Sequence, residues 1–269
     1  MSGEPMFRYR KLYTDVVTPS GSVCVGYASW LRCLGYELCS AGYEWYPAGG
    51  ERRVVRARGK AQVDIGRGEV QLRFQTAGEA FSLTLRAQSE HVEADVQQLT
   101  KHLSWQVLLG HARGRAQGVG GEGELLGAGY ADYVEMTRPP RALGLQSVEW
   151  GRGHVADESF VFTRARFADG RVFGSALSNG RVSDQLELVR SPKEDGDLLL
   201  RLAQGSVTLR GQRTLHAGSA LDGQRFPGLA ERAVARLCSG PVHERRWLAH
   251  ASFPSGASSL ALHEQVRLG

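Results

Sequence analysis

The segment that contains Tyr130 and Asp132 carries the most informative pair of side chains in the chain. In an extended strand, alternate residues project from the same face, so these two side chains are expected to lie side by side. A phenol can hydrogen-bond a carboxyl group, and the carboxyl can donate or accept a proton. The alternative is an exposed aspartate beside a core tyrosine. The pair is therefore a hypothesis for acid–base chemistry, with Asp132 as the acid and Tyr130 as its hydrogen-bond partner.

Other sequence features offer less support for catalysis. The chain contains no Gly-x-Ser-x-Gly motif, so a hydrolase triad is not supported. The glycine-rich run from Gly118 to Gly123 lacks the strand–helix context of a dinucleotide site and is expected to form a hairpin loop. The four cysteines show no Cys-x-x-Cys spacing, and no Cys/His set has the spacing of metal ligands. Cys24 stands in an apolar run and is expected in the core. No metal and no other cofactor is predicted.

Length, charge and hydropathy argue against a nucleic-acid-binding, secreted or membrane-spanning protein. A chain of 269 residues is long enough for two domains of ordinary size. Its formal net charge is +5, but the basic residues are scattered. Nucleic-acid binding requires basic clusters and a recognisable module, so no nucleic-acid partner is predicted. The first residues lack the apolar region of a secretory signal, and no window approaches the roughly 18 apolar residues of a membrane span. We therefore expect a cytoplasmic protein.

Short β-rich runs separated by turn signals recur along the chain. Residues 12–17 lead through Thr18-Pro19-Ser20-Gly21 into residues 22–30, as in a hairpin. Residues 159–167 and 171–177 flank Ala168-Asp169-Gly170 in the same way. Many short strands with frequent turns are typical of all-β sandwiches and barrels.

One segment departs from the strand pattern. Residues 228–238 have apolar side chains at roughly helical spacing, between Pro227-Gly228 and Ser239-Gly240-Pro241, and predict a short helix. A glycine-rich stretch and Pro139-Pro140 lie near the middle of the chain. They place a boundary at about residue 140, between an N-terminal domain of residues 1–140 and a C-terminal domain of residues 141–269.

The run Gly127-Ala128-Gly129-Tyr130-Ala131-Asp132 resembles the G-x-G-Y-x-[DE] motif of a lipocalin-like group of proteins, the carotenoid 1,2-hydratases, tocopherol cyclases and fungal Diels-Alderases. Trp150 occupies the place of the tryptophan-rich strand that follows the motif in this group. His102 and Trp105 occupy the place of an upstream histidine and tryptophan. The order of the predicted elements resembles that of the group over most of the chain. Only residues 127–153 carry motifs that are specific to the group.

The sequence also departs from the group's pattern. The relatives usually continue after the acid with a basic residue and Asn-Trp-Gly, whereas this chain has Tyr133-Val134-Glu135. The role of that asparagine is therefore missing or replaced. His102 and Trp105 are three residues apart, which places them on opposite faces of a regular strand. Only a bulge or a turn would let them share a pocket.

The resemblance implies an all-β fold of two consecutive lipocalin-like antiparallel barrels or half-barrels, with an apolar pocket between them. Substrate-binding roles are then expected for His102, Trp105 and Trp150. Tyr43 and Trp45 belong to an aromatic cluster that could line this pocket, although core packing explains the cluster equally well.

The implied function is an enzyme of natural-product biosynthesis, acting without a cofactor on an apolar unsaturated substrate of terpenoid, carotenoid or polyketide type. The reaction would be a cyclisation, hydration or isomerisation. Either a carboxylic acid protonates an alkene and aromatic rings stabilise the cation, or the pocket only orients the substrate. The alternatives are a non-catalytic carrier of the same kind of ligand and a protein–protein interaction scaffold. Transient membrane association through the substrate is also expected.

Proton donation sets a physical requirement on Asp132. At the reference pKa of ~3.9 an aspartate is ionised at pH 7 and has no proton to donate. Burial in an apolar pocket would have to raise its pKa toward 7, at a cost of about 4 kcal/mol.

Overall fold

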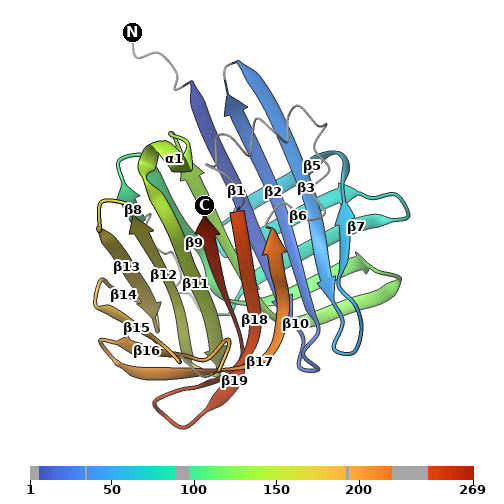
Figure 1. Cartoon of the computed structure of the whole chain (residues 1–269). Coiled ribbons are helices and arrows are strands. Elements are labelled where there is room, and N and C mark those ends of the chain that lie inside the picture. Colours follow the sequence, from blue (N-terminus) through green and yellow to red (C-terminus); the bar gives the residue numbers. More distant parts are fainter. Residues whose placement is uncertain (1–5, 34, 89–96, 192–193, 220–241) are drawn as a thin grey trace. The chain divides into compact units, whose positions relative to one another are not determined.

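The computed structural model describes residues 6–33, 35–88, 97–191, 194–219 and 242–269. The chain divides into two compact units, Met1–Arg138 and Pro139–Gly269, and each is described by itself. Strands dominate both units (Figure 1). The predicted helix at residues 228–238 lies outside the described residues. Within the described ranges, no helix is long and apolar enough to cross a membrane.

The first unit is a ten-stranded antiparallel sheet. Its strands are β1 (Phe7–Val17), β2 (Val23–Cys33), β3 (Tyr36–Tyr46), β4 (Arg53–Arg56), β5 (Arg58–Gly66), β6 (Glu69–Gln75), β7 (Ala80–Ala87), β8 (Gln97–Thr100), β9 (Leu103–Val119) and β10 (Glu122–Met136). The order is β4-β3-β2-β1-β10-β9-β7-β6-β5, and β8 pairs with β9. Strands β3 and β5 also contact each other, so the sheet curls toward closure.

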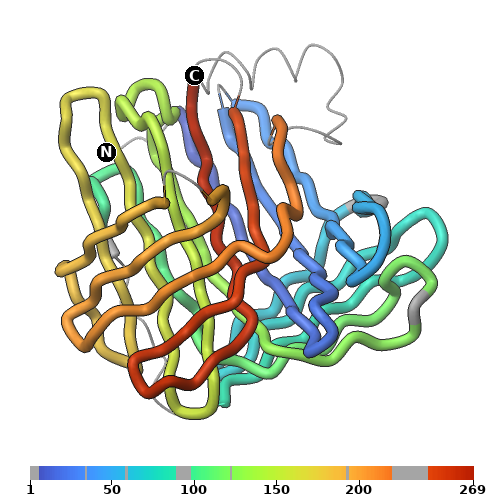
Figure 2. Tube along the Cα trace, turned by 60° about the horizontal axis from the view of Figure 1, so that its bottom comes forward, coloured from blue at the N-terminus to red at the C-terminus, as the bar shows by residue number. Residues whose placement is uncertain are grey.

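The second unit begins with the short helix α1 (Pro140–Leu143) and continues as a nine-stranded antiparallel sheet. Its strands are β11 (Leu145–Val155), β12 (Glu158–Phe167), β13 (Val172–Ser178), β14 (Arg181–Ser183), β15 (Leu186–Arg190), β16 (Leu198–Leu202), β17 (Gly205–Ser219), β18 (Val242–Ser252) and β19 (Ser258–Leu268). The order is β14-β13-β12-β11-β19-β18-β17-β16-β15. Figure 2 shows β15, β16 and β17 running side by side in orange.

The two sheets repeat one strand order. In each, the first four strands of the unit run in reverse order from one edge, and the first strand pairs with the last: β1 with β10, and β11 with β19. The all-β class of two consecutive antiparallel sheets is therefore confirmed. Both predicted hairpins are present, as β1–β2 and β12–β13, with Gly21 and Gly170 at positive φ in their turns.

One face of the first sheet carries the apolar core of that unit. Leu12 on β1, Cys24 on β2, Leu109 on β9 and Ala131 on β10 all belong to this core. The expectation that Cys24 is a core residue is confirmed. Because side chains alternate along a strand, the neighbours of Leu12 and Ala131 project from the opposite face. We call that opposite surface the site face, defined by Tyr13, Asp15, Tyr130 and Asp132.

A hairpin joins β9 to β10, the strand that carries Tyr130 and Asp132. It turns at Gly120 and Gly121, whose φ angles are +60° and +82°. Residues with a Cβ rarely adopt such angles, which explains the glycine-rich run. The predicted hairpin loop at Gly118–Gly123 is confirmed as a tight turn between two long strands.

Candidate active site

Asp132 accepts two hydrogen bonds on one carboxylate oxygen. The Tyr130 hydroxyl donates to Oδ2 at 2.8 Å, and the Trp105 indole Nε1–H donates to the same oxygen at 3.1 Å. All three side chains are buried: Tyr130 is 0% exposed, Trp105 4% and Asp132 5%. The hydrogen bond expected between Tyr130 and Asp132 is therefore present. The roles of these residues in catalysis stay a prediction.

Trp105 reaches this site because of irregularities in the β9–β10 pairing. Leu109 lies opposite Ala131, and Val107 lies opposite Asp132, so β9 carries an extra residue between these pairs. In a regular strand, Trp105 would share the core face with Leu109, four residues away. The bulge reverses the alternation and turns Trp105 to the face of Asp132. Bulges that redirect a side chain in this way occur often beside active sites.

Strand β1 adds a second Tyr-x-Asp pair to the site face. Tyr13 lies directly opposite Asp132 in the β1–β10 register, and Asp15 lies directly opposite Tyr130. The rings of Tyr13 and Tyr130 are tilted, with centroids 6.2 Å apart. Asp15 is 0% exposed. The four residues thus form a compact patch of two phenols and two carboxyl groups.

Sequence reasoning did not assign Tyr13 or Asp15 to the site. A signal was available, since Tyr13-Thr14-Asp15 repeats the spacing of Tyr130-Ala131-Asp132. It becomes meaningful only when the first and last strands of the unit are known to pair.

The phenol of Tyr130 stays protonated across the neutral range. Burial raises the pKa of Tyr130 well above 10, and the carboxyl groups of Asp132 and Asp15 raise it further. Tyr130 therefore acts as a hydrogen-bond donor to Asp132. Because Oδ2 already accepts two hydrogen bonds, a proton carried by this carboxyl group would sit on Oδ1. The arrangement can present an acidic hydrogen next to aromatic rings in a water-poor environment.

His102 does not join this group. It precedes β9, and its Nδ1 hydrogen-bonds the Thr137 hydroxyl at 3.0 Å, while its carbonyl accepts the Thr137 amide. Thr137 follows the end of β10, five residues beyond Asp132, a separation of about 17 Å along an extended strand. His102 therefore lies at the end of the strand pair, and its role in substrate binding stays a prediction.

Tyr43 and Trp45 also lie away from Asp132. Both are core residues of the first unit, on the sheet face that carries Ala131. The Tyr43 ring stacks on Phe81 at 4.7 Å, and its hydroxyl accepts a hydrogen bond from the Gly120 amide. Side-chain alternation puts them on the face opposite Asp132, and their role in substrate binding stays a prediction.

Trp150 belongs to the second unit, on β11. It is buried, and it lies opposite Glu264 of β19. Its neighbour Gly151 lies opposite the core residue Phe162, so Trp150 projects from the other face of its own sheet. Its predicted role in substrate binding stays a prediction.

A metal centre finds no support in the described part of the chain. No group of three or more His, Cys, Asp or Glu side chains there is arranged to hold a metal ion. The site face offers carboxyl, phenol and indole groups, which suit proton transfer and aromatic contact.

Sequence comparisons identify no relative. No protein-family model matches the chain, and no curated protein matches it in sequence.

Solved structures do match it. CghA in complex with Sch210972 is 12% identical, with a TM-score of 0.59 over 98% of this chain and 88% of the other. Kievitone hydratase from Nectria haematococca is 12% identical, with a TM-score of 0.54 over 97% and 89%. An AttH-like protein from Nitrosomonas europaea is 11% identical, with a TM-score of 0.55 over 97% and 92%. The chain has the lipocalin-like two-domain fold that these proteins share.

Proposed function

We propose that this protein is a biosynthetic enzyme that cyclises, hydrates or isomerises an apolar unsaturated small molecule. The observation that carries the proposal is the buried Asp132 carboxyl group, held by Tyr130 and Trp105. A carrier of apolar ligands has no need of such a group, because burying a carboxyl costs free energy. Two similar structures support the class of reaction, since CghA is a Diels-Alderase and another is a hydratase.

In the proposed acid mechanism, Asp132 donates the proton on Oδ1 to an alkene carbon. The alkene π electrons form the new C–H bond, and the O–H electrons remain on the carboxylate. The hydrogen bonds from Tyr130 and Trp105 stabilise that carboxylate as its charge develops. Water, an internal nucleophile or a second alkene then captures the cation. The proton released in that step, or by elimination, returns to Asp132 and restores the acid.

Aromatic rings on the site face suit the cationic intermediate. Tyr13 lies opposite Asp132 in the β1–β10 register, and Tyr130 and Trp105 both hydrogen-bond its carboxyl group. The faces of such rings attract positive charge, with a contribution of about 0.5–2 kcal/mol each. A substrate of terpenoid, carotenoid or polyketide type would present the alkene. We extend the proposal to a cytoplasmic enzyme that needs no cofactor and meets membranes transiently through its substrate.

An orientation mechanism remains the alternative within this class. A pericyclic cyclisation transfers no proton, and the enzyme then contributes by holding the substrate in a reactive conformation. Asp132 would act in that case as a hydrogen-bonding group that polarises the substrate.

A substrate panel tests the proposal. Purified protein is incubated with linear polyenes, prenyl compounds and unsaturated polyketides, and the products are separated and identified by mass spectrometry. We expect conversion of at least one compound, to an isomer of equal mass or to a product heavier by one water. Tight binding across the panel without any conversion would establish a carrier and contradict the proposal. Absence of both binding and conversion would contradict the substrate class.

A further inference from the structure

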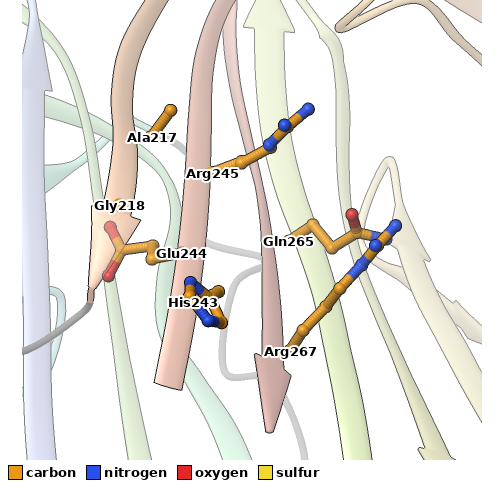
Figure 3. A pocket seen from close by; sticks show the side chains of 7 residues that line it. All are labelled: Ala217, Gly218, His243, Glu244, Arg245, Gln265 and Arg267. Carbon is orange, nitrogen blue, oxygen red and sulfur yellow. The ribbon is translucent and has the colours of Figure 1, made fainter. Parts of the chain in front are cut away.

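A basic hollow lies over the end of the second sheet. It has a volume of about 440 Å³ and lies where β17 ends, β18 begins and β19 ends. Figure 3 shows the side chains that line it, which are Ala217, Gly218, His243, Glu244, Arg245, Gln265 and Arg267. Gln265 and Arg267 extend toward the same side in this view.

The polar lining continues the core face of the second sheet. Ala261 on β19 and Ala249 on β18 belong to the apolar core of this unit. Both strands pair without irregularity, so Gln265, Arg267 and Arg245 project from the same face as these alanines. Toward one end of the sheet, the apolar side chains on this face are therefore replaced by cationic ones. The open ends of β-barrels are common sites of ligand binding.

The hollow and its surroundings carry an excess of positive charge. Arg190 and Arg164 lie 2.8 Å and 3.9 Å from the buried Glu149 carboxylate. Glu149 also accepts a hydrogen bond from Gln265 at 3.1 Å. Arg245 lies 3.3 Å from Asp195. The guanidinium groups of Arg164 and Arg190 therefore share the carboxylate of Glu149, and Arg245 pairs with that of Asp195.

Two of the lining residues, Arg267 and Glu244, decide the charge balance of the hollow. Arg267 forms no ion pair with any described residue, although it borders the hollow directly. Among the described residues that line the hollow, Glu244 is the only acidic one, and it is already paired, since Arg246 lies 2.7 Å from its carboxylate. Counted over these described residues, the charge left unbalanced is positive.

We propose that this hollow binds the phosphate or diphosphate group of a small molecule. Guanidinium groups bind such oxyanions through paired, charge-assisted hydrogen bonds, and several of them favour a multiply charged group over a single carboxylate. Arg267 and Arg245 supply the charge, and His243 supplies a ring nitrogen at the rim. This site does not depend on the proposed chemistry at Asp132.

Calorimetric titration of the full-length protein with inorganic pyrophosphate at low ionic strength tests the site. We expect saturable binding by the wild-type protein. Loss of a charge-assisted hydrogen bond should weaken the affinity about tenfold or more in Arg267→Gln and in Arg245→Gln. Arg201→Gln is the matched control, because Arg201 is an exposed arginine of the same unit that pairs with Glu187. Its affinity should equal that of the wild type, as should that of Asp132→Asn.

Three results would overturn the proposal: no saturable heat with the wild-type protein, undiminished affinity when both Arg245 and Arg267 are replaced by Gln, or equal affinity for acetate. Circular dichroism melting of each variant verifies that it is folded. A parallel titration with butyl phosphate distinguishes the source of the anion. If butyl phosphate binds more tightly than inorganic phosphate, the ligand is an organic phosphate. If it binds more weakly, the ligand is the free anion.

Discussion

Tyr130 has a buried carboxyl group on each side, with Asp132 two residues along β10 and Asp15 directly opposite on β1. Its hydroxyl donates to Asp132 at 2.8 Å. One phenol thus orients the proposed acid, and the sheet pairing keeps a second acidic residue beside it.

Replacing Tyr130 by Phe removes the donor and keeps the ring. We expect the variant to lose about 1–3 kcal/mol of stability, because a buried carboxyl group loses a hydrogen bond. Urea unfolding at pH 7 measures this loss. Tyr36→Phe is the control, since Tyr36 is 77% exposed and should change stability little. Equal stability of Tyr130→Phe and the wild type would mean that the hydrogen bond contributes nothing.

The same variant should change the stability of the protein at alkaline pH. The pKa of Tyr130 is raised in the folded state above its ordinary value of 10. As pH rises above about 10, the tyrosine ionises in the unfolded chain but stays protonated in the folded one. Folding stability therefore falls there, by about 1.4 kcal/mol per pH unit for this group.

Urea unfolding between pH 9 and 11 measures that slope. Burial also raises the pKa of Tyr27 and Tyr43, so the wild type should show a steeper total loss than one residue gives. Tyr130→Phe should show a shallower loss than the wild type. Identical slopes would argue against a buried, protonated Tyr130.

Trp105→Phe tests the second hydrogen bond to Asp132. The variant keeps an aromatic ring but loses the indole N–H, so we expect turnover to fall by about tenfold, as for loss of one hydrogen bond to a charged group. Substrate affinity should change less than turnover. Trp30→Phe serves as the control, because Trp30 packs against the core rather than contacting Asp132. A turnover rate equal to that of the wild type would show that Tyr130 alone suffices to hold the acid.

Because His263 in the second unit is buried, we expect the folding stability of the protein to fall at acidic pH. Burial lowers its pKa to about 3, and it stacks on Trp247 with ring centroids 4.8 Å apart. Below pH 6.5 the histidine takes up a proton in the unfolded chain but not in the folded one, so stability falls from pH 6.5 toward about 3. The loss is about 1.4 kcal/mol per pH unit over that range.

His263→Phe keeps the stacking and removes the titration, so its stability should depend less on pH in this range. Denaturant unfolding at pH 7, 6, 5 and 4 compares it with the wild type and with His243→Phe, which replaces an exposed histidine. A slope unchanged by His263→Phe would contradict a buried neutral imidazole.

The sequence was sufficient to predict the all-β class and the shared strand face of Tyr130 and Asp132. Alternation in Tyr130-Ala131-Asp132 predicted the shared face and the hydrogen bond, because both depend only on local strand geometry. Trp105 could not be placed in the same way. The bulge that turns it toward Asp132 arises from the pairing of β9 with β10, and no residue in the sequence marks it.

The remaining differences have the same origin. Asp15 meets Tyr130 because the first and last strands of the unit pair, which is a long-range contact that local patterns do not specify. Tyr43 and Trp45 are buried, but burial alone does not show which face of the sheet they lie on. Both faces of this sheet carry buried side chains, so alternation cannot show which aromatic residues belong to the core.

In the proposed mechanism, Asp132 donates the proton. The most direct test is single-turnover conversion of a substrate found in the panel, comparing the wild type with Asp132→Asn and with Asp64→Asn, which replaces an exposed aspartate of the same unit. We expect Asp132→Asn to lose about 100-fold or more in rate while its ligand dissociation constant stays within about twofold, and Asp64→Asn to behave as the wild type. A rate for Asp132→Asn within about tenfold of the wild type, at unchanged affinity, would contradict general acid catalysis by this residue.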